Sequence, residues 1–258
     1  MIGLHTETHG HGKPLVLVHG WGMHSEIWRE FALQLAEDFQ VTMIDLPGHG
    51  HSDAIDQYSL TRIATELVNT IPEPAVWLGW SLGGAVVLQL AQNHPDQIKG
   101  LLLVCANPKY SSSSDWPMAM DGKVLNEFAQ AVRENDQITL ARFTGLMTQG
   151  EGELTRDMLR FVRKRLPQAP AADRNALLWG LDVLQNADLR TQYQQIKQPL
   201  SVVLGENDPL VPSQVGEQLE LLNPDADVHV VKNAGHLPFL SQQLTMLGLV
   251  KAFMQRID

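Results

Sequence analysis

The feature that most constrains this chain is the sequence Gly-Trp-Ser-Leu-Gly at residues 79–83. An apolar run over 74–78 precedes it, and a helix-forming run over 85–93 follows it. This arrangement is typical of a nucleophile elbow, a sharp strand-to-helix turn that lifts a serine hydroxyl to the edge of a sheet. Gly79 and Gly83 are expected where a Cβ would collide with neighbouring backbone. The motif therefore predicts Ser81 as a nucleophile, although a lone motif of this kind also occurs as a chance turn.

Short apolar runs alternate with amphipathic stretches along most of the chain. Apolar residues at helical spacing predict the intervening helices, the first two with Ser25 and Ser59 as N-caps. The alternation predicts an α/β fold class, with a mostly parallel central sheet flanked by helices. Six runs rich in β-branched residues are typical of strands buried on both faces: 15–18, 41–44, 75–78, 100–104, 200–204 and 228–231.

The alternation stops between residues 109 and 190. This region shows no good strand, and helical spacing is visible over 124–132, 138–146 and 155–165. A chain of 258 residues suits one large α/β domain, or one domain that carries an inserted segment. We therefore expect an α/β core of residues 1–108 and 191–258, interrupted by a helical cap, or lid, over residues 109–190.

Two further polar residues each follow a predicted strand, Asp208 after the fifth and His236 after the sixth. Catalytic groups in open α/β sheets gather at the carboxyl ends of strands. A serine hydroxyl needs a base to take its proton and an acid to orient that base. The order serine, acid, histidine matches this topology and predicts a catalytic set of Ser81, Asp208 and His236. The alternatives are a structural loop histidine and a turn-forming Asp208, with Glu206 or Asp182 as the acid.

An oxyanion hole needs two backbone N–H groups aimed at the developing charge. Leu82, directly after the nucleophile, should supply one of them. Trp21, in the sequence His-Gly-Trp-Gly that follows the first predicted strand, should supply the other. The Trp21 side chain is also expected to wall the acyl pocket. The alternative is a glycine turn with an incidental tryptophan.

Composition and charge exclude several classes of protein. A net charge of −10 argues against nucleic acid or an anionic membrane as a partner. The single cysteine, Cys105, leaves no internal disulfide framework and is expected to be buried and inert. No apolar run approaches a membrane span and no signal peptide is visible, so a cytoplasmic protein is expected. Histidines lack metal-ligand spacing, and His49 and His51 are expected to be solvated. The histidine spacing therefore leads us to expect no metal, and the lack of a phosphate-binding loop leads us to expect no cofactor.

Positive charge gathers in one segment of this acidic chain. Residues 142–165 hold six basic and three acidic side chains. Arg156, Arg160, Arg163 and Lys164 are spaced to share one face of a helix. Such a face would steer an acidic partner toward the cap. The alternative is an ordinary solvated helix face.

These residues carry a family resemblance. The chain resembles α/β-hydrolases over essentially its whole length, and more closely the pimeloyl-[acyl-carrier-protein] methyl ester esterases of biotin synthesis. Enzymes of that family hydrolyse the methyl ester at the far end of a pimeloyl chain held by acyl carrier protein. The closer resemblance rests on the segments 19–22, 77–84, 115–117, 142–143 with Leu146, 180–184 and 188–190.

The resemblance implies a serine carboxylesterase that releases pimeloyl-[acyl-carrier protein] and methanol. It also implies a monomer that meets acyl carrier protein transiently, with carrier docking at Arg142, Arg156 and Arg160. The chain departs from the family pattern at Met118, where glycine is expected, and at Ile138, where a basic residue is expected; these departures shift the docking set toward Arg163. The implied substrate contacts are Trp21, Ser81, Leu82, Phe143, Thr144, Gly145, Leu146, Met147 and His236.

Two other functions compete with this interpretation. One is an esterase or carbon–carbon bond hydrolase that acts on a free small molecule without a carrier protein. The other is a non-enzymatic receptor that keeps the fold to bind a ligand, since fold alone never fixes function. Serine at position 81 disfavours dehalogenase and epoxide hydrolase chemistry, which would use an aspartate there.

Overall fold

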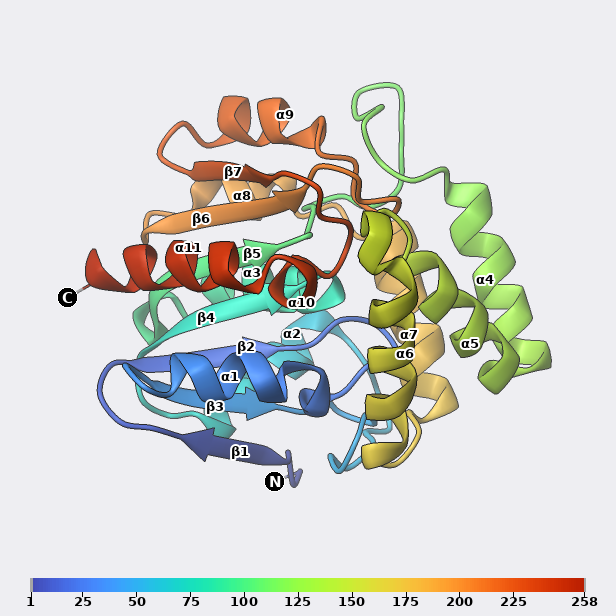
Figure 1. The fold of residues 1–258 in the computed structure, drawn as a ribbon, viewed down its shortest axis with the longest axis horizontal. Coiled ribbons are helices and arrows are strands. Elements are labelled where there is room, and N and C mark those ends of the chain that lie inside the picture. Colours follow the sequence, from blue (N-terminus) through green and yellow to red (C-terminus); the bar gives the residue numbers. More distant parts are fainter. Residues whose placement is uncertain (1, 258) are drawn as a thin grey trace.

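The computed structural model describes residues 2–257, and its core is one seven-stranded sheet (Figure 1). The strands lie in the order β1-β3-β2-β4-β5-β6-β7, and all pairs are parallel except β1 with β3. The predicted α/β fold with a mostly parallel sheet is confirmed. The strands are β1 (Thr6–His9), β2 (Pro14–Val18), β3 (Gln40–Ile44), β4 (Ala75–Trp80), β5 (Ile98–Val104), β6 (Leu200–Gly205) and β7 (Asp227–Val231).

The six predicted strands are all present, and β1 was not predicted. Its residues are polar and mostly half-buried because it pairs antiparallel at the sheet edge, with Thr6 opposite Ile44. An edge strand needs no continuous apolar run, so the pattern that marks central strands is missing there. The central strands β4 and β6 are buried at every position.

Helices cover both faces of the sheet. In Figure 1, α1 and α11 lie in front of it, whereas α2, α3 and α8 lie behind it. Helix α9 packs against β7 and α8. The helices are η1 (Ser25–Trp28), α1 (Arg29–Leu35), α2 (Leu60–Thr70), α3 (Leu82–Asn93), η2 (Pro95–Gln97), α8 (Arg190–Gln195), α9 (Val215–Leu222), α10 (Pro238–Ser241) and α11 (Gln243–Gln255).

One of the two predicted N-caps is correct. The Ser59 side chain accepts a hydrogen bond from the N–H of Arg62 at the start of α2. Ser25 is not a cap, because it lies inside the 3₁₀ turn η1 and its own N–H donates to the buried Asp45 carboxylate at 2.6 Å. A loop carboxylate distant in sequence thus replaces the local side-chain cap.

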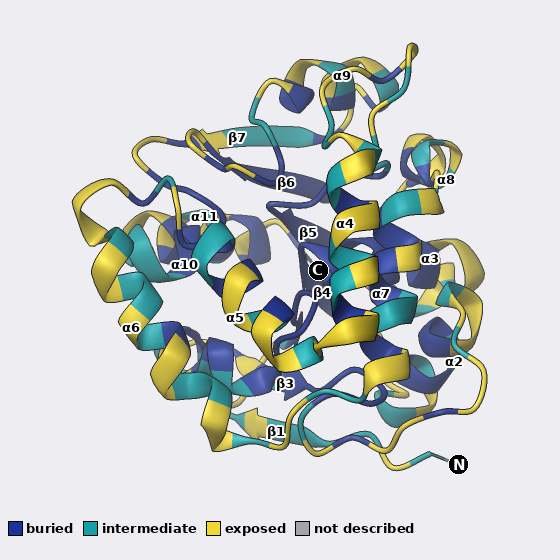
Figure 2. Cartoon of the chain, turned by 90° about the vertical axis from the view of Figure 1, so that its right-hand side faces the viewer, coloured by how far each residue is buried: buried dark blue, intermediate teal, exposed yellow. Residues whose placement is uncertain are grey.

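The segment between β5 and α8 is helical, and we use the name cap for residues 109–190. Its elements are α4 (Gly122–Glu134), α5 (Asp136–Met147), η3 (Gly152–Leu154), α6 (Thr155–Arg165), η4 (Leu166–Gln168) and α7 (Arg174–Asn186). The three predicted helices are present as α4, α5 and α6, and α7 was not singled out. The cap helices lie beyond the carboxyl ends of the strands, and Figure 2 looks onto them from that side. The division into core and cap domains stays a prediction.

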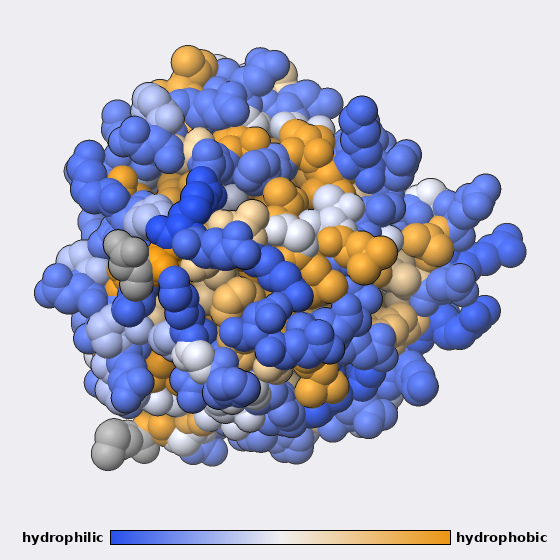
Figure 3. All heavy atoms as spheres, turned by 60° about the vertical axis from the view of Figure 1, so that its left-hand side comes forward, coloured by the Kyte–Doolittle hydropathy of each residue, from blue (hydrophilic) through white to orange (hydrophobic). Residues whose placement is uncertain are grey.

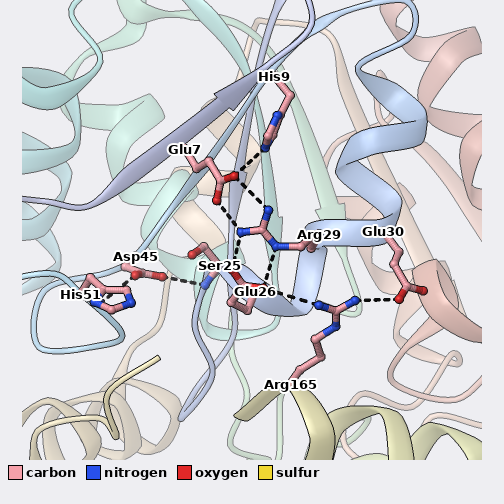
Figure 4. A network of polar contacts seen from close by, with 9 residues as sticks. All are labelled: Glu7, His9, Ser25, Glu26, Arg29, Glu30, Asp45, His51 and Arg165. Atoms are coloured by element: carbon pink, nitrogen blue, oxygen red, sulfur yellow. Dashed lines mark hydrogen bonds and ion pairs between the residues drawn. The ribbon is translucent and has the colours of Figure 1, made fainter. Parts of the chain in front are cut away.

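An ion-pair network ties the cap to the core (Figure 4). Arg165 of α6 contacts the carboxylates of Glu26 and Glu30, at 3.6 and 2.6 Å. Arg29 in turn binds Glu26 and the Glu7 carboxylate of β1. Hydrogen bonds from the Arg29 guanidinium hold the pKa of both Glu7 and Glu26 below their ordinary range. The network joins α6 to η1, α1 and the edge strand.

The surface carries both polar side chains and exposed apolar ones. Hydrophilic side chains surround the apolar ones on the face shown in Figure 3. The most exposed large apolar side chains, Leu244 and Leu221, lie on α11 and α9. Within residues 2–257, no helix is both long enough and apolar enough to cross a bilayer.

Candidate active site

Ser81 stands at a strained turn between β4 and α3. Its φ of +55° and ψ of −121° are rare for a residue with a side chain and fit the elbow geometry. A Cβ on Gly79 would lie 2.4 Å from the carbonyl oxygen of Gly83, and a Cβ on Gly83 would lie 2.5 Å from that of Val18. The predicted need for glycine at both positions is confirmed, and its cause is close backbone approach.

The backbone of Ser81 is held on both sides. Its N–H donates to the carbonyl of Val104, the last residue of β5, at 3.0 Å. Its carbonyl accepts a hydrogen bond from the Tyr110 hydroxyl, and burial raises the pKa of that phenol. Tyr110 lies in the chain that enters the cap, and no sequence motif marked it.

Asp208 and His236 meet in a buried hydrogen bond. The Nδ1 atom of His236 lies 2.7 Å from Oδ2 of Asp208, and both side chains have at most 1% of their surface exposed. The other carboxylate oxygen, Oδ1, accepts from the N–H groups of Leu210 and Val211, at 2.8 and 3.1 Å. The Nε2 atom of His236 is buried and has no hydrogen-bond partner among residues 2–257. The imidazole is thus fixed through Nδ1, whereas Nε2 makes no hydrogen bond, so the structure does not show one between His236 and the Ser81 hydroxyl.

The two alternative acids lie elsewhere. Glu206 is exposed, and its carboxylate accepts the N–H of Asn233. Asp182 is exposed on α7 and binds the amide of Asn186. Of these three carboxylates, only that of Asp208 contacts the histidine.

The loop after β2 lies directly against the nucleophile. A Cβ on Gly20 would lie 3.1 Å from Cβ of Ser81, which places the neighbouring Trp21 backbone beside the elbow. The Trp21 indole N–H donates to the carbonyl of Leu177 at 2.8 Å. Its ring packs edge-to-face on Phe143, with centroids 4.7 Å apart. The Trp21 ring therefore packs against Phe143, and Phe143 lines an apolar cleft beside Ser81 that is described below.

Two buried histidines hold this loop and the next one. His19 accepts the N–H of Leu46 at Nε2, and burial lowers its pKa to about 3. His49 is fully buried, and burial lowers its pKa to about 4. The expectation of a solvated His49 is wrong, because the loop over 45–52 folds inward around the buried Asp45 carboxylate; His51 is exposed as expected.

A narrow apolar cleft of about 20 Å³ lies beside Ser81. Ser81 and Phe143 of the predicted substrate contacts line it. Thr144 borders a second groove instead, Met147 is fully buried, and Leu146 and Gly145 are half-buried. The sequence interpretation missed most of the wall, although leucines at helical spacing on α7 were a visible signal. The other lining residues are Tyr110, Met120, Leu125, Phe128, Leu181, Leu184, Leu210 and Val211.

Cys105 lies behind the acid–histidine pair. It is buried, and burial reinforced by the Asp208 carboxylate raises the pKa of its thiol, so the group stays protonated. Within residues 2–257, one set of three potential metal ligands lies close together: Cys105, Asp208 and His236, within 4.8 Å. In that set, the hydrogen bond between Asp208 and His236 occupies one ligand atom of each, and the thiol is protonated. The arrangement suits proton transfer better than metal binding.

The predicted docking arginines lie on the surface of the cap. Arg142 on α5, together with Arg156 and Arg160 on α6, is exposed. The Arg160 side chain is 80% exposed and pairs with Asp157 on its own helix. Arg142 borders a shallow depression that shares Phe128 with the cleft at Ser81. These positions are compatible with docking and do not test it.

Comparison with known proteins places this geometry in context. The sequence profile of the α/β hydrolase fold family matches residues 13–243. A curated protein of Methylococcus capsulatus, named pimeloyl-[acyl-carrier protein] methyl ester esterase, is 39% identical over 252 residues, covering 98% of both chains. An esterase from Exiguobacterium antarcticum superposes with a TM-score of 0.88 at 20% identity, covering 98% of this chain and 96% of that one. An esterase from Thermogutta terrifontis gives 0.83 at 22%, covering 99% and 94%. Both structures share the fold.

Proposed function

The chain belongs to the α/β-hydrolase family, and we propose that it hydrolyses the methyl ester of pimeloyl-[acyl-carrier protein] in biotin synthesis. It is a carboxylic ester hydrolase. The observation that carries the substrate assignment is the 39% identity, over 98% of both chains, to a protein named for that reaction. The products are pimeloyl-[acyl-carrier protein] and methanol.

The first half of the proposed reaction forms an acyl-enzyme. The Ser81 hydroxyl oxygen attacks the ester carbonyl while Nε2 of His236 takes its proton. Asp208 accepts a hydrogen bond from the Nδ1–H group of His236, which holds the proton on Nδ1 and leaves Nε2 as the acceptor. The backbone N–H groups of Leu82 and Trp21 stabilise the charge on the carbonyl oxygen. The acyl-enzyme is complete when the C–O bond to the methoxide breaks: the Nε2 proton passes to the departing methoxide, and methanol leaves.

The second half releases the acid. Water then attacks the acyl-enzyme carbonyl and gives a proton to His236, and this proton returns to Ser81 as the ester bond to the enzyme breaks. The carboxylic acid product, which then loses its proton to water, and the starting enzyme result.

The apolar cleft supports an aliphatic acyl chain. Leu125, Leu181 and Leu184 line it, and Ser81 stands in its wall. Each methylene group moved from water into such a cleft contributes about 0.8 kcal/mol. The apolar lining therefore suits an aliphatic acyl chain better than a polar acyl group.

Acyl carrier protein is the proposed transient partner. Arg142, Arg156 and Arg160 present positive charge on the cap of a protein whose net charge is −10. Arg142 lies beside Phe128, which borders the cleft, so a carrier docked there would be close to the cleft at Ser81. We propose further that residues 109–190 act as a lid and that the enzyme is monomeric and cytoplasmic. Size-exclusion chromatography with light scattering would measure its oligomeric state.

The deciding experiment compares the methyl ester of pimeloyl-[acyl-carrier protein] with free dimethyl pimelate. We expect a higher kcat/KM for the carrier-linked ester, and we expect R156E combined with R160E to remove this advantage while leaving the free ester unaffected. The matched control is R256E, which reverses the charge of an exposed arginine next to the end of α11. Equal loss on both substrates would reject docking at this face. Faster turnover of the free ester would favour a small-molecule esterase, and no turnover of either would favour a receptor.

A further inference from the structure

We propose that Glu151 is a positioning residue that holds His236 in place and connects the cap to the catalytic histidine. The inference rests on the proposed function, in which His236 is the general base. In the sequence, Glu151 is one of the three acidic residues of the segment 142–165, and no motif marks it. The structure instead buries its carboxylate, with 2% of the residue exposed.

The Glu151 carboxylate accepts hydrogen bonds from the backbone on both sides of the histidine. Its Oε2 accepts the N–H of Gly235 and its Oε1 accepts the N–H of Leu237, both at 2.9 Å. No lysine or arginine in residues 2–257 forms an ion pair with it. Hydrogen bonds to a carboxylate are stronger than those between neutral groups. Two of them, flanking one residue, restrict how the His236 peptide segment can shift or rotate.

Two glycines in the left-handed region set the direction of this side chain. Gly150 and Gly152 have φ values of +85° and +57°, which glycine adopts without the strain of a side chain. A Cβ on Gly150 would lie 2.1 Å from the carbonyl oxygen of Asn207, next to Asp208. A Cβ on Gly235 would lie 2.9 Å from Oε1 of Glu151. The turn that follows α5 is therefore pressed against both the acid loop and the histidine loop.

The core supports the same histidine from the other direction. The Trp80 indole N–H donates to the carbonyl of His236 at 2.9 Å. The Cys105 thiol donates to the carbonyl of Gly235, with a sulfur-to-oxygen distance of 3.7 Å. Glu151 adds a cap contact to these core contacts. The orientation of the base thus depends on the cap being in place.

Removing these two hydrogen bonds should lower the rate of the chemical step and have little effect on substrate binding. An alanine would leave two buried N–H groups without acceptors, so the loop would relax toward other partners. Misplacement of a catalytic group by about 1 Å can cost about 10²-fold in rate. Glutamine keeps the shape but turns an NH₂ group toward one of the two N–H donors, so it should restore only part of the rate.

The test measures kcat and KM for p-nitrophenyl acetate in E151A, E151Q and the control E153Q, at a temperature well below thermal unfolding of each variant. Glu153 is exposed two residues away, in η3. We expect kcat to fall about 10- to 100-fold in E151A and less in E151Q, with KM within about threefold of the wild type. E153Q should match the wild type.

A change in KM with unaltered kcat, or wild-type kcat in folded E151A, would overturn the proposal. If E151A does not fold, E151Q decides, and wild-type kcat there has the same meaning. The small ester keeps this test separate from the carrier. Wild-type activity in H236A would refute the site itself. If the wild-type enzyme hydrolyses the small ester but not the carrier-linked ester, the proposed substrate is wrong and the role of Glu151 is unaffected.

Discussion

Replacing Asp208 by asparagine should disable the base while leaving the fold unchanged. In the wild type, Oδ1 of Asp208 accepts two backbone N–H groups, from Leu210 and Val211, and Oδ2 faces Nδ1 of His236. The amide oxygen of an asparagine must therefore take the Oδ1 position, because an NH₂ group there would face two donors. The NH₂ group is left facing Nδ1.

That orientation forces the wrong histidine tautomer. An NH₂ donor requires an unprotonated Nδ1, so the proton moves to Nε2, which then cannot accept the proton of Ser81. The same substitution in serine proteases lowers kcat by roughly 10⁴-fold. At 1.36 kcal/mol for each factor of ten, this corresponds to about 5 kcal/mol of transition-state stabilisation. We expect a loss of about 10³- to 10⁴-fold here, with little change in KM.

The assay is the steady-state hydrolysis of p-nitrophenyl acetate, with the thermal unfolding midpoint measured alongside. E206Q is the matched control, because Glu206 is the neighbouring exposed carboxylate on the same loop and contacts the N–H of Asn233. It should retain nearly wild-type kcat. A D208N enzyme within tenfold of the wild type, or an equal loss in E206Q, would refute the assignment of Asp208 as the acid.

Three further predictions concern the cleft, the ion pair between Glu26 and Arg29, and two glycines. L184W should fill the cleft and lower kcat/KM about tenfold more for p-nitrophenyl octanoate than for the acetate; equal effects would place the acyl chain elsewhere. Because Arg29 holds the pKa of Glu26 below its ordinary 4.5, this carboxylate stabilises the fold above that pH and loses its contribution as pH falls further. Urea unfolding of E26Q should therefore show a deficit at pH 7 that shrinks below pH 4.5. G79A should cost about 1–3 kcal/mol or more through its backbone clash, whereas G248A, in open space on α11, should gain about 0.5–1 kcal/mol; calorimetry measures both.

Much of the fold was predictable because its signals are local. The central strands are buried on both faces, so their apolar runs are continuous and visible in the sequence. The edge strand β1 lacks that burial and was missed. The Ser25 cap failed for a different reason, since the competing Asp45 carboxylate comes from a loop 20 residues away.

The candidate site divides in the same way. The elbow motif and the residues after two strands pointed to Ser81, Asp208 and His236, because chemistry demands particular residue types at particular strand ends. The structure brings Asp208 and His236 into hydrogen-bond contact. Their catalytic roles stay predictions until the variants are measured.

The sequence alone determined the parallel strands of the sheet, the turn at Ser81 and the order of the catalytic candidates, since each depends on residue type, spacing or a steric need for glycine. Only the tertiary structure decided which side chains surround them. The Tyr110 hydroxyl and the Glu151 carboxylate look ordinary in sequence and acquire their places through contacts of the cap with the core. Burial supplies the physical reason: a carboxylate in water is a surface charge, whereas the same group enclosed against two N–H donors orients the loop it holds.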